Sequence, residues 1–133
     1  MSAKYANLRV FVRARALKTR IRAMSGRLKA GFWTSALIRQ AEQNGAFAAV
    51  IRKGDPDAGA CLVKVRTLDG QAVLYRPVRN MNGERVWWPK GPNLEGEIDH
   101  YINTRIDDDP DLWVLEIEDR KGRHFLTESI EKP

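Results

Sequence analysis

The residues best suited to chemistry are two aspartates and a lysine in the first half of the chain. Asp55 and Asp57 stand in a turn, and Lys64 follows in an alternating apolar stretch. One group of metal-dependent nucleases uses an aspartate followed by an acid-x-lysine triplet, because two acids hold Mg²⁺ near a scissile phosphate while the lysine stabilises charge or orients water. The position two residues before Lys64, where the second acid belongs, is Leu62. A nuclease or phosphodiesterase therefore needs another acid, and Glu116 is the candidate.

Glu116 and Glu118 form a second acidic pair. They lie two residues apart in an alternating stretch, so on a strand their side chains point to the same face. Such a pair could act as acid and base or bind a cation. Opposite Lys53, Lys64 or Arg66 it would instead form cross-strand salt bridges, which is the more common role of charged residues on a strand.

No complete catalytic set is predicted elsewhere. His100 and His124 have no cysteine or histidine partner at metal-ligand spacing. The aspartates between 107 and 111 lack the alternation, central glycine and terminal glutamate of a calcium loop. Cys61 is the only cysteine, which excludes an intramolecular disulfide, and its apolar neighbours are typical of a buried thiol in a reducing compartment. The sequence thus predicts no metal and no cofactor.

Trp87 and Trp88 are informative because they are adjacent. Consecutive residues of a strand face opposite sides, so both can be buried only if both faces of the sheet are covered. The alternatives are a second covering layer, or one exposed tryptophan near Arg85 and Lys90 that would suit stacking or a protein interface.

The elements that position these residues begin with a helix from Ala30 to Asn44, where Asn44 and Gly45 can form a left-handed cap. The nearly continuous apolar run from Ala46 to Arg52 predicts a strand that is covered on both faces and central in its sheet. After a turn cluster at 54–59, Cys61 to Thr67 alternates as a second strand.

Two hairpin signals, Asp69-Gly70 and Asn82-Gly83, continue the sheet. They lead to strands at 72–75 and 85–88, which Pro77 and Pro89 are expected to end. Asn93 can cap a second helix, and a half-buried strand follows at 113–118 with a last short strand from Arg123 to Leu126.

This order, α-β-β-β-β-α-β-β, predicts an α+β fold. We expect a mostly antiparallel sheet of five or six strands with two helices packed on it, in two or three layers, because the apolar stripe of each helix needs a large surface to cover it. The length fits a single domain, predicted to span residues 27–133.

The charge of +6 is concentrated at the N-terminus. Residues 1–30 contain nine lysines and arginines and no acid, so the remaining residues carry 6 − 9 = −3. Residues 1–26 are interpreted as a basic leader, either a disordered tail or an amphipathic helix, and Met24 is an alternative translation start. Nucleic acid or an anionic membrane is expected as a partner only through this leader, and no apolar run is long enough for a transmembrane segment.

Several segments in order resemble one bacterial family, known only as domain of unknown function 1491. They are GFWTSALIR at 31–39, RKGDPDAG at 52–59, VKV at 63–65 and DPDLWVLEIED at 109–119. The likeness spans about residues 27–126. It implies no activity, cofactor or catalytic residue, so the functional interpretation depends on the residues themselves.

The sequence favours a small, non-catalytic, cytoplasmic binding or accessory protein, because no complete catalytic set can be assembled from its residues. Its partner is not identified by the sequence, and a protein is one candidate. One alternative is an enzyme in which Asp55 and Glu116 are metal ligands and Lys64 stabilises charge, and another is nucleic-acid binding through the leader. The predicted contact surface consists of Arg52, Lys53, Asp55, Lys64 and Trp88.

Overall fold

Two helices and five strands make up residues 29–133, the part of the chain that this computed structural model describes. The predictions for the leader, residues 1–26, lie outside the described residues. In chain order the elements are α2 (Ala30–Gln43), β1 (Phe47–Arg52), β2 (Cys61–Arg66), β3 (Gln71–Arg79), β4 (Arg85–Leu94), α3 (Glu95–Asp108) and β5 (Trp113–Glu118).

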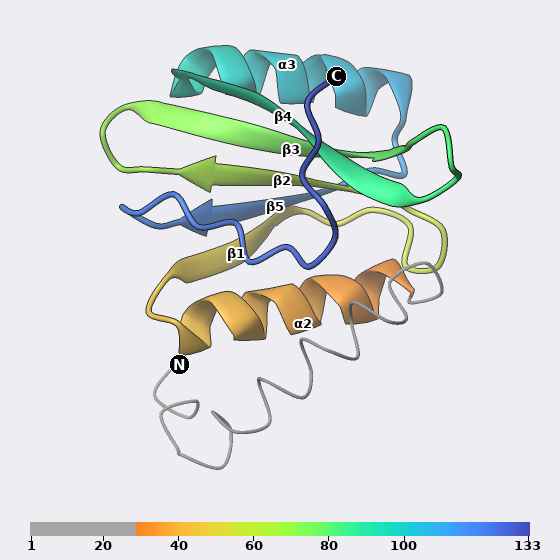
Figure 1. Cartoon of the computed structure of the whole chain (residues 1–133), viewed down its shortest axis with the longest axis horizontal. Helices are drawn as coiled ribbons and strands as arrows, with labels where there is room; N and C mark the ends of the chain where they lie inside the picture. The colour runs from red at the N-terminus through yellow and green to blue at the C-terminus, as the bar shows by residue number, and fades with distance from the viewer. Residues whose placement is uncertain (1–28) are drawn as a thin grey trace.

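The strands form one five-stranded sheet in the order β1-β5-β2-β3-β4. All neighbours are antiparallel except β2 and β5, which run parallel, because the chain crosses over through α3 before β5 enters the sheet (Figure 1). The predicted α+β fold with a mostly antiparallel sheet is confirmed.

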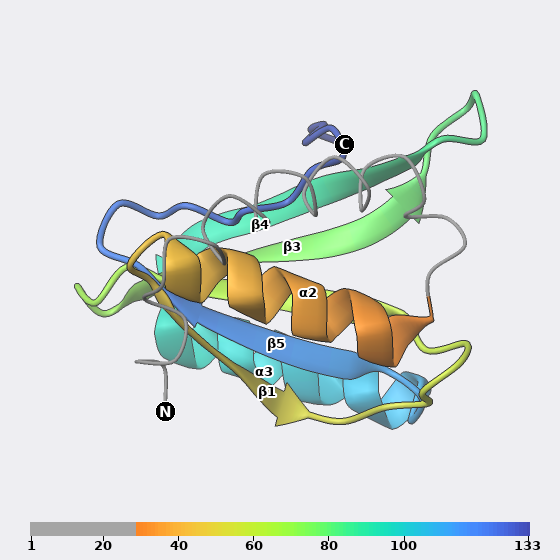
Figure 2. The ribbon, with the colours of Figure 1, turned by 90° about the horizontal axis from the view of Figure 1, so that it is seen from below.

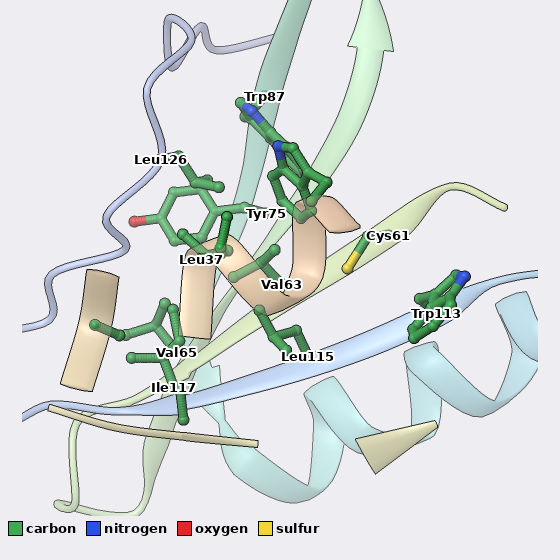
Figure 3. Packing of buried hydrophobic residues seen from close by; sticks show 14 of the residues in the cluster. Leu37, Cys61, Val63, Val65, Tyr75, Trp87, Trp113, Leu115, Ile117 and Leu126 are labelled. Carbon is green, nitrogen blue, oxygen red and sulfur yellow. The ribbon is translucent and has the colours of Figure 1, made fainter. Parts of the chain in front are cut away.

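The sheet is covered by one helix on each face, so the fold has three layers (Figures 1 and 2). Consecutive residues of β2 are buried on opposite faces: Leu62 packs in the cluster under α3, and Val63 packs in the cluster under α2. The larger cluster, on the α2 face, is drawn in Figure 3. Its labelled members are Leu37, Cys61, Val63, Val65, Tyr75, Trp87, Trp113, Leu115, Ile117 and Leu126.

The two adjacent tryptophans divide between these faces. Trp87 is completely buried on the α2 face, where its ring stacks on Trp33 with 5.6 Å between centroids. Trp88 points to the other face and is half-buried. The covering layer that the sequence left open is therefore present, and it leaves one tryptophan partly accessible.

The prediction that the first strand is central is wrong, because β1 is an edge strand. The apolar side chains of β1 lie in two different environments. Ala48 joins the core under α2, but Phe47 and Ile51 are each 58% exposed. β5 lies between β1 and β2, and β2 is the central strand of the five.

The predicted last strand, Arg123 to Leu126, is not formed, so the sheet has five strands and not six. The backbone of Phe125 has φ of 60°, which is incompatible with an extended strand. Arg123 is instead held by its backbone and side chain on the carboxylate of Asp119. The chain then runs on to Ile130, which forms a parallel bridge with Trp87.

Prolines also end fewer strands than predicted. β3 continues through Pro77, because that part of β3 pairs only with β4 and no ladder bond to β2 is needed there. β4 continues through Pro89 and Pro92 to Leu94, since an edge strand can present a residue without N–H on its open side.

Candidate functional site

Lys64 lies at the centre of a charged cluster between the sheet and α3. It projects from the middle of β2 and is only 4% exposed. Its Nζ lies 2.7 Å from Glu95 Oε2, 2.6 Å from Asp99 Oδ1 and 3.1 Å from Glu116 Oε1. An ammonium group has three protons, so these three carboxylates can satisfy it fully.

Arg66 extends the same cluster along β2. Its Nη1 donates to Glu118 Oε2 at 2.6 Å, and its Nε forms an ion pair with Glu95 Oε2 at 2.7 Å. The predicted pairing of Glu116 and Glu118 with basic residues of a neighbouring strand is therefore present, with Lys64 and Arg66 as the bases.

Hydrogen bonds control the ionisation of this cluster. Burial alone would lower the pKa of Lys64, but the hydrogen bonds that Lys64 donates to Asp99, Glu95 and Glu116 outweigh this effect and raise that pKa. The hydrogen bond from Lys64 in turn lowers the pKa of Glu95, against the opposing effect of burial. Lys64 thus joins α3 to the sheet as a permanently charged crosslink, and its protons are already committed to protein carboxylates.

Asp55 lies in the loop before β2 and has a structural role there. Its Oδ1 accepts hydrogen bonds from the amides of Ala58 and Asp57, which lower the pKa of Asp55. Its own backbone N–H donates to the carbonyl of Asp111, and its carbonyl accepts from Trp113 Nε1 at 2.7 Å. The loop is pressed so tightly on this segment that a Cβ at Gly54 would collide with the carbonyl oxygen of Asp111.

The alternative catalytic set is therefore only partly assembled. Lys64 and Glu116 are 3.1 Å apart, but the contacts of Asp55 are all with its own turn and with the segment that leads into β5. Within residues 29–133, no three histidine, cysteine, aspartate or glutamate side chains are arranged to hold a metal ion.

The five residues of the predicted contact surface also lie in separate places. Arg52 ends β1 and donates from Nη2 to the carbonyl of Pro110 at 2.8 Å, and Lys53 follows it on the surface. Trp88 belongs to β4, at the opposite edge of the sheet. Lys64 is buried between the two edges. The expected clustering was wrong because it assumed that strands close in sequence are neighbours, whereas β5 separates β1 from β2.

Trp88 lies beside Lys90, as the sequence indicated, and near two residues that the sequence did not indicate, Arg76 and Tyr101. Arg76 is directly opposite it on β3, with Cζ 6.0 Å from the Trp88 ring and 5.8 Å from the ring of Tyr101 on α3. Arg76 Nη1 also donates to Tyr101 Oη at 3.3 Å, and Lys90 Nζ lies 4.8 Å from the Tyr101 ring. We call Arg76, Trp88, Lys90 and Tyr101 the cation–aromatic patch.

The patch differs from the Lys64 cluster in its charge. Among the described residues, no carboxylate forms an ion pair with Arg76 or Lys90, and Arg76 Nε is buried without a hydrogen-bond partner. All four side chains are half-buried, so each ring or charge keeps a part of its surface accessible. Two cations held over aromatic rings can bind an anionic group while the rings contact apolar atoms beside it.

The register of the β3–β4 hairpin decides which residue faces Trp88. A two-residue turn at Asn82-Gly83, as the sequence predicts, would place Pro77 opposite Trp88. The structure instead closes a three-residue loop at 81–83 with Asn80 bonded to Glu84, and this shift by one residue places Arg76 opposite Trp88. Arg85, named from the sequence as a neighbour of Trp88, lies instead 5.7 Å from the Trp87 ring on the other face.

Cys61 is not a candidate nucleophile. It is buried in the α2-facing core, and burial raises the pKa of its thiol to about 12. The thiolate that nucleophilic chemistry needs is therefore absent at physiological pH. Neither of the described helices has the length and apolar character that a bilayer span requires.

Comparison with known proteins places this arrangement among proteins without an assigned activity. The family described as "Protein of unknown function (DUF1491)" matches residues 28–127. A crystal structure of a DUF1491 family protein from Caulobacter crescentus CB15 is 50% identical, with a TM-score of 0.74, and the match covers 78% of this chain and 99% of that one. An NMR structure of a DUF1491 family protein from the same organism is 48% identical, with a TM-score of 0.70 and coverage of 79% and 97%.

A third solved structure, of protein Atu0922 from A. tumefaciens, is 36% identical, with a TM-score of 0.67 and coverage of 77% and 94%. No curated protein matches the chain. The fold is thus shared with bacterial relatives, and the described geometry remains the basis for a functional conclusion.

Proposed function

The chain belongs to the DUF1491 family, and from this premise we propose that it is a small, non-catalytic, cytoplasmic binding protein whose contact surface is the cation–aromatic patch. One observation carries the proposal: Arg76 and Lys90 are the cations of a half-buried aromatic cluster in which no carboxylate of the described residues neutralises them. Tryptophan, tyrosine and arginine are the residues that most often dominate the affinity of protein interfaces.

The saturated state of Lys64 supports a binding role over a catalytic one. A lysine that stabilises a transition state must direct its charge at the substrate, and Lys64 directs it at Glu95, Asp99 and Glu116. The cluster accordingly fixes α3 on the sheet, and this holds Tyr101 over Arg76.

We propose an acidic segment of another protein as the partner. Its carboxylates would pair with Arg76 and Lys90, and its apolar atoms would lie on Trp88. Nucleic acid fits less well, because residues 31–133 carry a charge of 14 − 17 = −3 and a phosphate polymer would extend well beyond the patch.

Titration with a short polyglutamate peptide, followed by amide and indole NMR shifts, tests the proposal. We expect the Trp88 indole and the Lys90 and Tyr101 amides to shift, and the shifts to weaken as salt is added. Lys90→Gln should weaken binding several-fold, and Trp88→Ala should also weaken it.

Lys121→Gln is the matched control, since it removes an exposed cation in the turn after β5, away from the patch. Binding that is equally reduced by Lys90→Gln and Lys121→Gln would show only general charge attraction. Shifts produced by an oligothymidylate but not by polyglutamate would replace the protein partner with nucleic acid.

A further inference from the structure

The outward edge of β1 is an unused interaction surface, distinct from the proposed contact surface. β1 pairs only with β5, and no other backbone hydrogen bond within residues 29–133 involves Phe47 to Arg52. Three of its large apolar side chains are exposed: Phe47 by 58%, Val50 by 39% and Ile51 by 58%. Edge strands usually avoid this combination with charges, prolines or a covering segment.

We propose that a second copy of this chain occupies this edge. In this arrangement the two β1 strands pair antiparallel about a two-fold axis near Ala48 and Ala49, and the two five-stranded sheets become one continuous sheet. The association is isologous, so the same residues contribute from both copies and each contact is made twice.

The side-chain sizes along β1 are self-complementary. Directly opposite residues of an antiparallel pair share a face of the sheet, which allows a two-fold axis at Ala48 or at Ala49. In both registers Val50 of one copy faces an alanine of the other, while Phe47 faces either Ala49 or Ile51. Large residues thus meet small or apolar ones, and no charged side chain is brought into the middle of the pair.

The charged residues of β1 do not oppose this pairing. Arg52, the last residue of the strand, lies toward Asn44 or Ala46 of the other copy in the two registers, so no two cations are placed opposite each other. Glu118, the cross-strand neighbour of Phe47, is already ion-paired with Arg66 inside each copy.

The irregularity between Val50 and Arg52 limits how the edge can be used. It shortens the regular part of the strand to Phe47–Val50, which offers few main-chain hydrogen bonds to an added peptide. In a two-fold pair, the short strands of both copies contribute main-chain hydrogen bonds, and the side chains of two folded domains contact each other as well.

Sedimentation velocity of the full chain over a range of concentrations is the first test. We expect a monomer–dimer equilibrium, and Phe47→Lys should raise the dissociation constant by at least about tenfold, the factor that corresponds to about 1.4 kcal/mol. Because Phe47 is 58% exposed, this variant keeps its fold, and its circular dichroism spectrum should be unchanged. Met81→Lys is the matched control, since it replaces a fully exposed apolar side chain in the β3–β4 loop and should leave the equilibrium unchanged.

Crosslinking locates the axis. Ala49→Cys places a thiol next to its symmetry mate, whereas the native Cys61 is buried and does not compete for a short bismaleimide. We expect a crosslinked dimer with Ala49→Cys and none with Met81→Cys. A wild-type chain that stays monomeric at all concentrations overturns the proposal, as does a dimer that Phe47→Lys leaves intact or that Met81→Cys crosslinks equally well.

Discussion

The two edges of the sheet differ in whether another segment of the described chain covers them. At the β4 edge, Trp87 receives a hydrogen-bonded segment from the end of the chain: its N–H donates to Ser129 and its carbonyl accepts from Glu131, each at 2.9 Å. Pro89 and Pro92 remove donors farther along the same strand. The β1 edge has neither device within residues 29–133, and it exposes phenylalanine, valine and isoleucine.

Within residues 29–133, the C-terminal segment covers the β4 edge and no segment covers the β1 edge. A covered edge cannot pair with another molecule, so the location of the cover decides where association can occur. The binding surface that we propose lies beside the covered edge, and the self-association surface lies at the open edge. The following variants change one edge at a time, from the largest expected effect to the smallest.

The largest effect is expected from Trp87→Ala, which removes the anchor of the covered edge. Trp87 is fully buried, stacks on Trp33 and donates from Nε1 to Glu128 at 3.0 Å, so its loss leaves a large cavity. The free energy of unfolding should fall by about 4 kcal/mol, as measured by urea denaturation. Trp88→Ala is the control: it removes a half-buried ring of the same size and should cost clearly less. Equal losses for the two variants would contradict the burial described here.

Lys64→Met tests the charged cluster on β2, the strand that lies midway between the two edges of the sheet. The substitution removes the cation that joins Glu95, Asp99 and Glu116, and only Arg66 then remains to pair with Glu95 and Glu116, so we expect a loss of about 3 kcal/mol. Lys121→Met, at an exposed position, should be nearly neutral.

Acid titration checks the same cluster by a second route. The pKa of Glu95 is lowered in the folded state from its ordinary value of 4.5, so its ion pair stabilises the fold above that pH. This stability is lost as the pH falls through the lowered folded pKa. Lys64→Met should weaken this acid dependence, and an unchanged dependence would mean that other carboxylates cause it.

Removal of residues 128–133 opens the covered edge without a change in the core. Trp87 then loses the partners of its backbone N–H and of its indole N–H, and unsatisfied buried donors should reduce the free energy of unfolding by roughly 2 kcal/mol. We also expect a new association through β4, visible by sedimentation. If the shortened chain associates only as the full chain does, the C-terminal segment is not what protects this edge.

The smallest effect is expected from Ile51→Lys at the open edge. In dilute solution, where the chain is monomeric, stability should change by no more than about 0.5 kcal/mol, because Ile51 is 58% exposed. A thermal unfolding curve at low concentration measures this. A large loss would show that Ile51 is held against the monomer more firmly than its exposure indicates.

Local signals in the sequence predicted the helices and most strands well. Asn44-Gly45 indicated the end of α2, and Asp69-Gly70 indicated the turn between β2 and β3. They failed where distant residues decide the outcome. The segment after Gly122 does not form a strand, because the backbone of Phe125 is left-handed. The hydrogen bonds of Arg123 with Asp119 hold the chain in a turn at this point.

The candidate site was harder to predict for the same reason. The saturated state of Lys64 depends on α3 crossing above β2, and no spacing along the chain joins Lys64 to Glu95 or Asp99. The position of β1 depended on the parallel insertion of β5, which separates strands that are consecutive in sequence. The pairing of Arg76 with Trp88 depends on the three-residue loop at 81–83, whereas the two-residue turn expected at Asn82-Gly83 would have placed Pro77 opposite Trp88.

The insertion of β5 between β1 and β2 also has a consequence for the order of folding. The β2–β3–β4 meander can form from neighbouring residues, but β1 has no strand partner until residues 113–118 have been synthesised and have entered the sheet. In pulse-labelled hydrogen exchange during refolding, amides of the meander should gain protection first and those of β1 last. A chain still attached to the ribosome would hold Phe47 and Ile51 without a sheet beside them for most of its synthesis, which makes this segment a natural binding site for a chaperone.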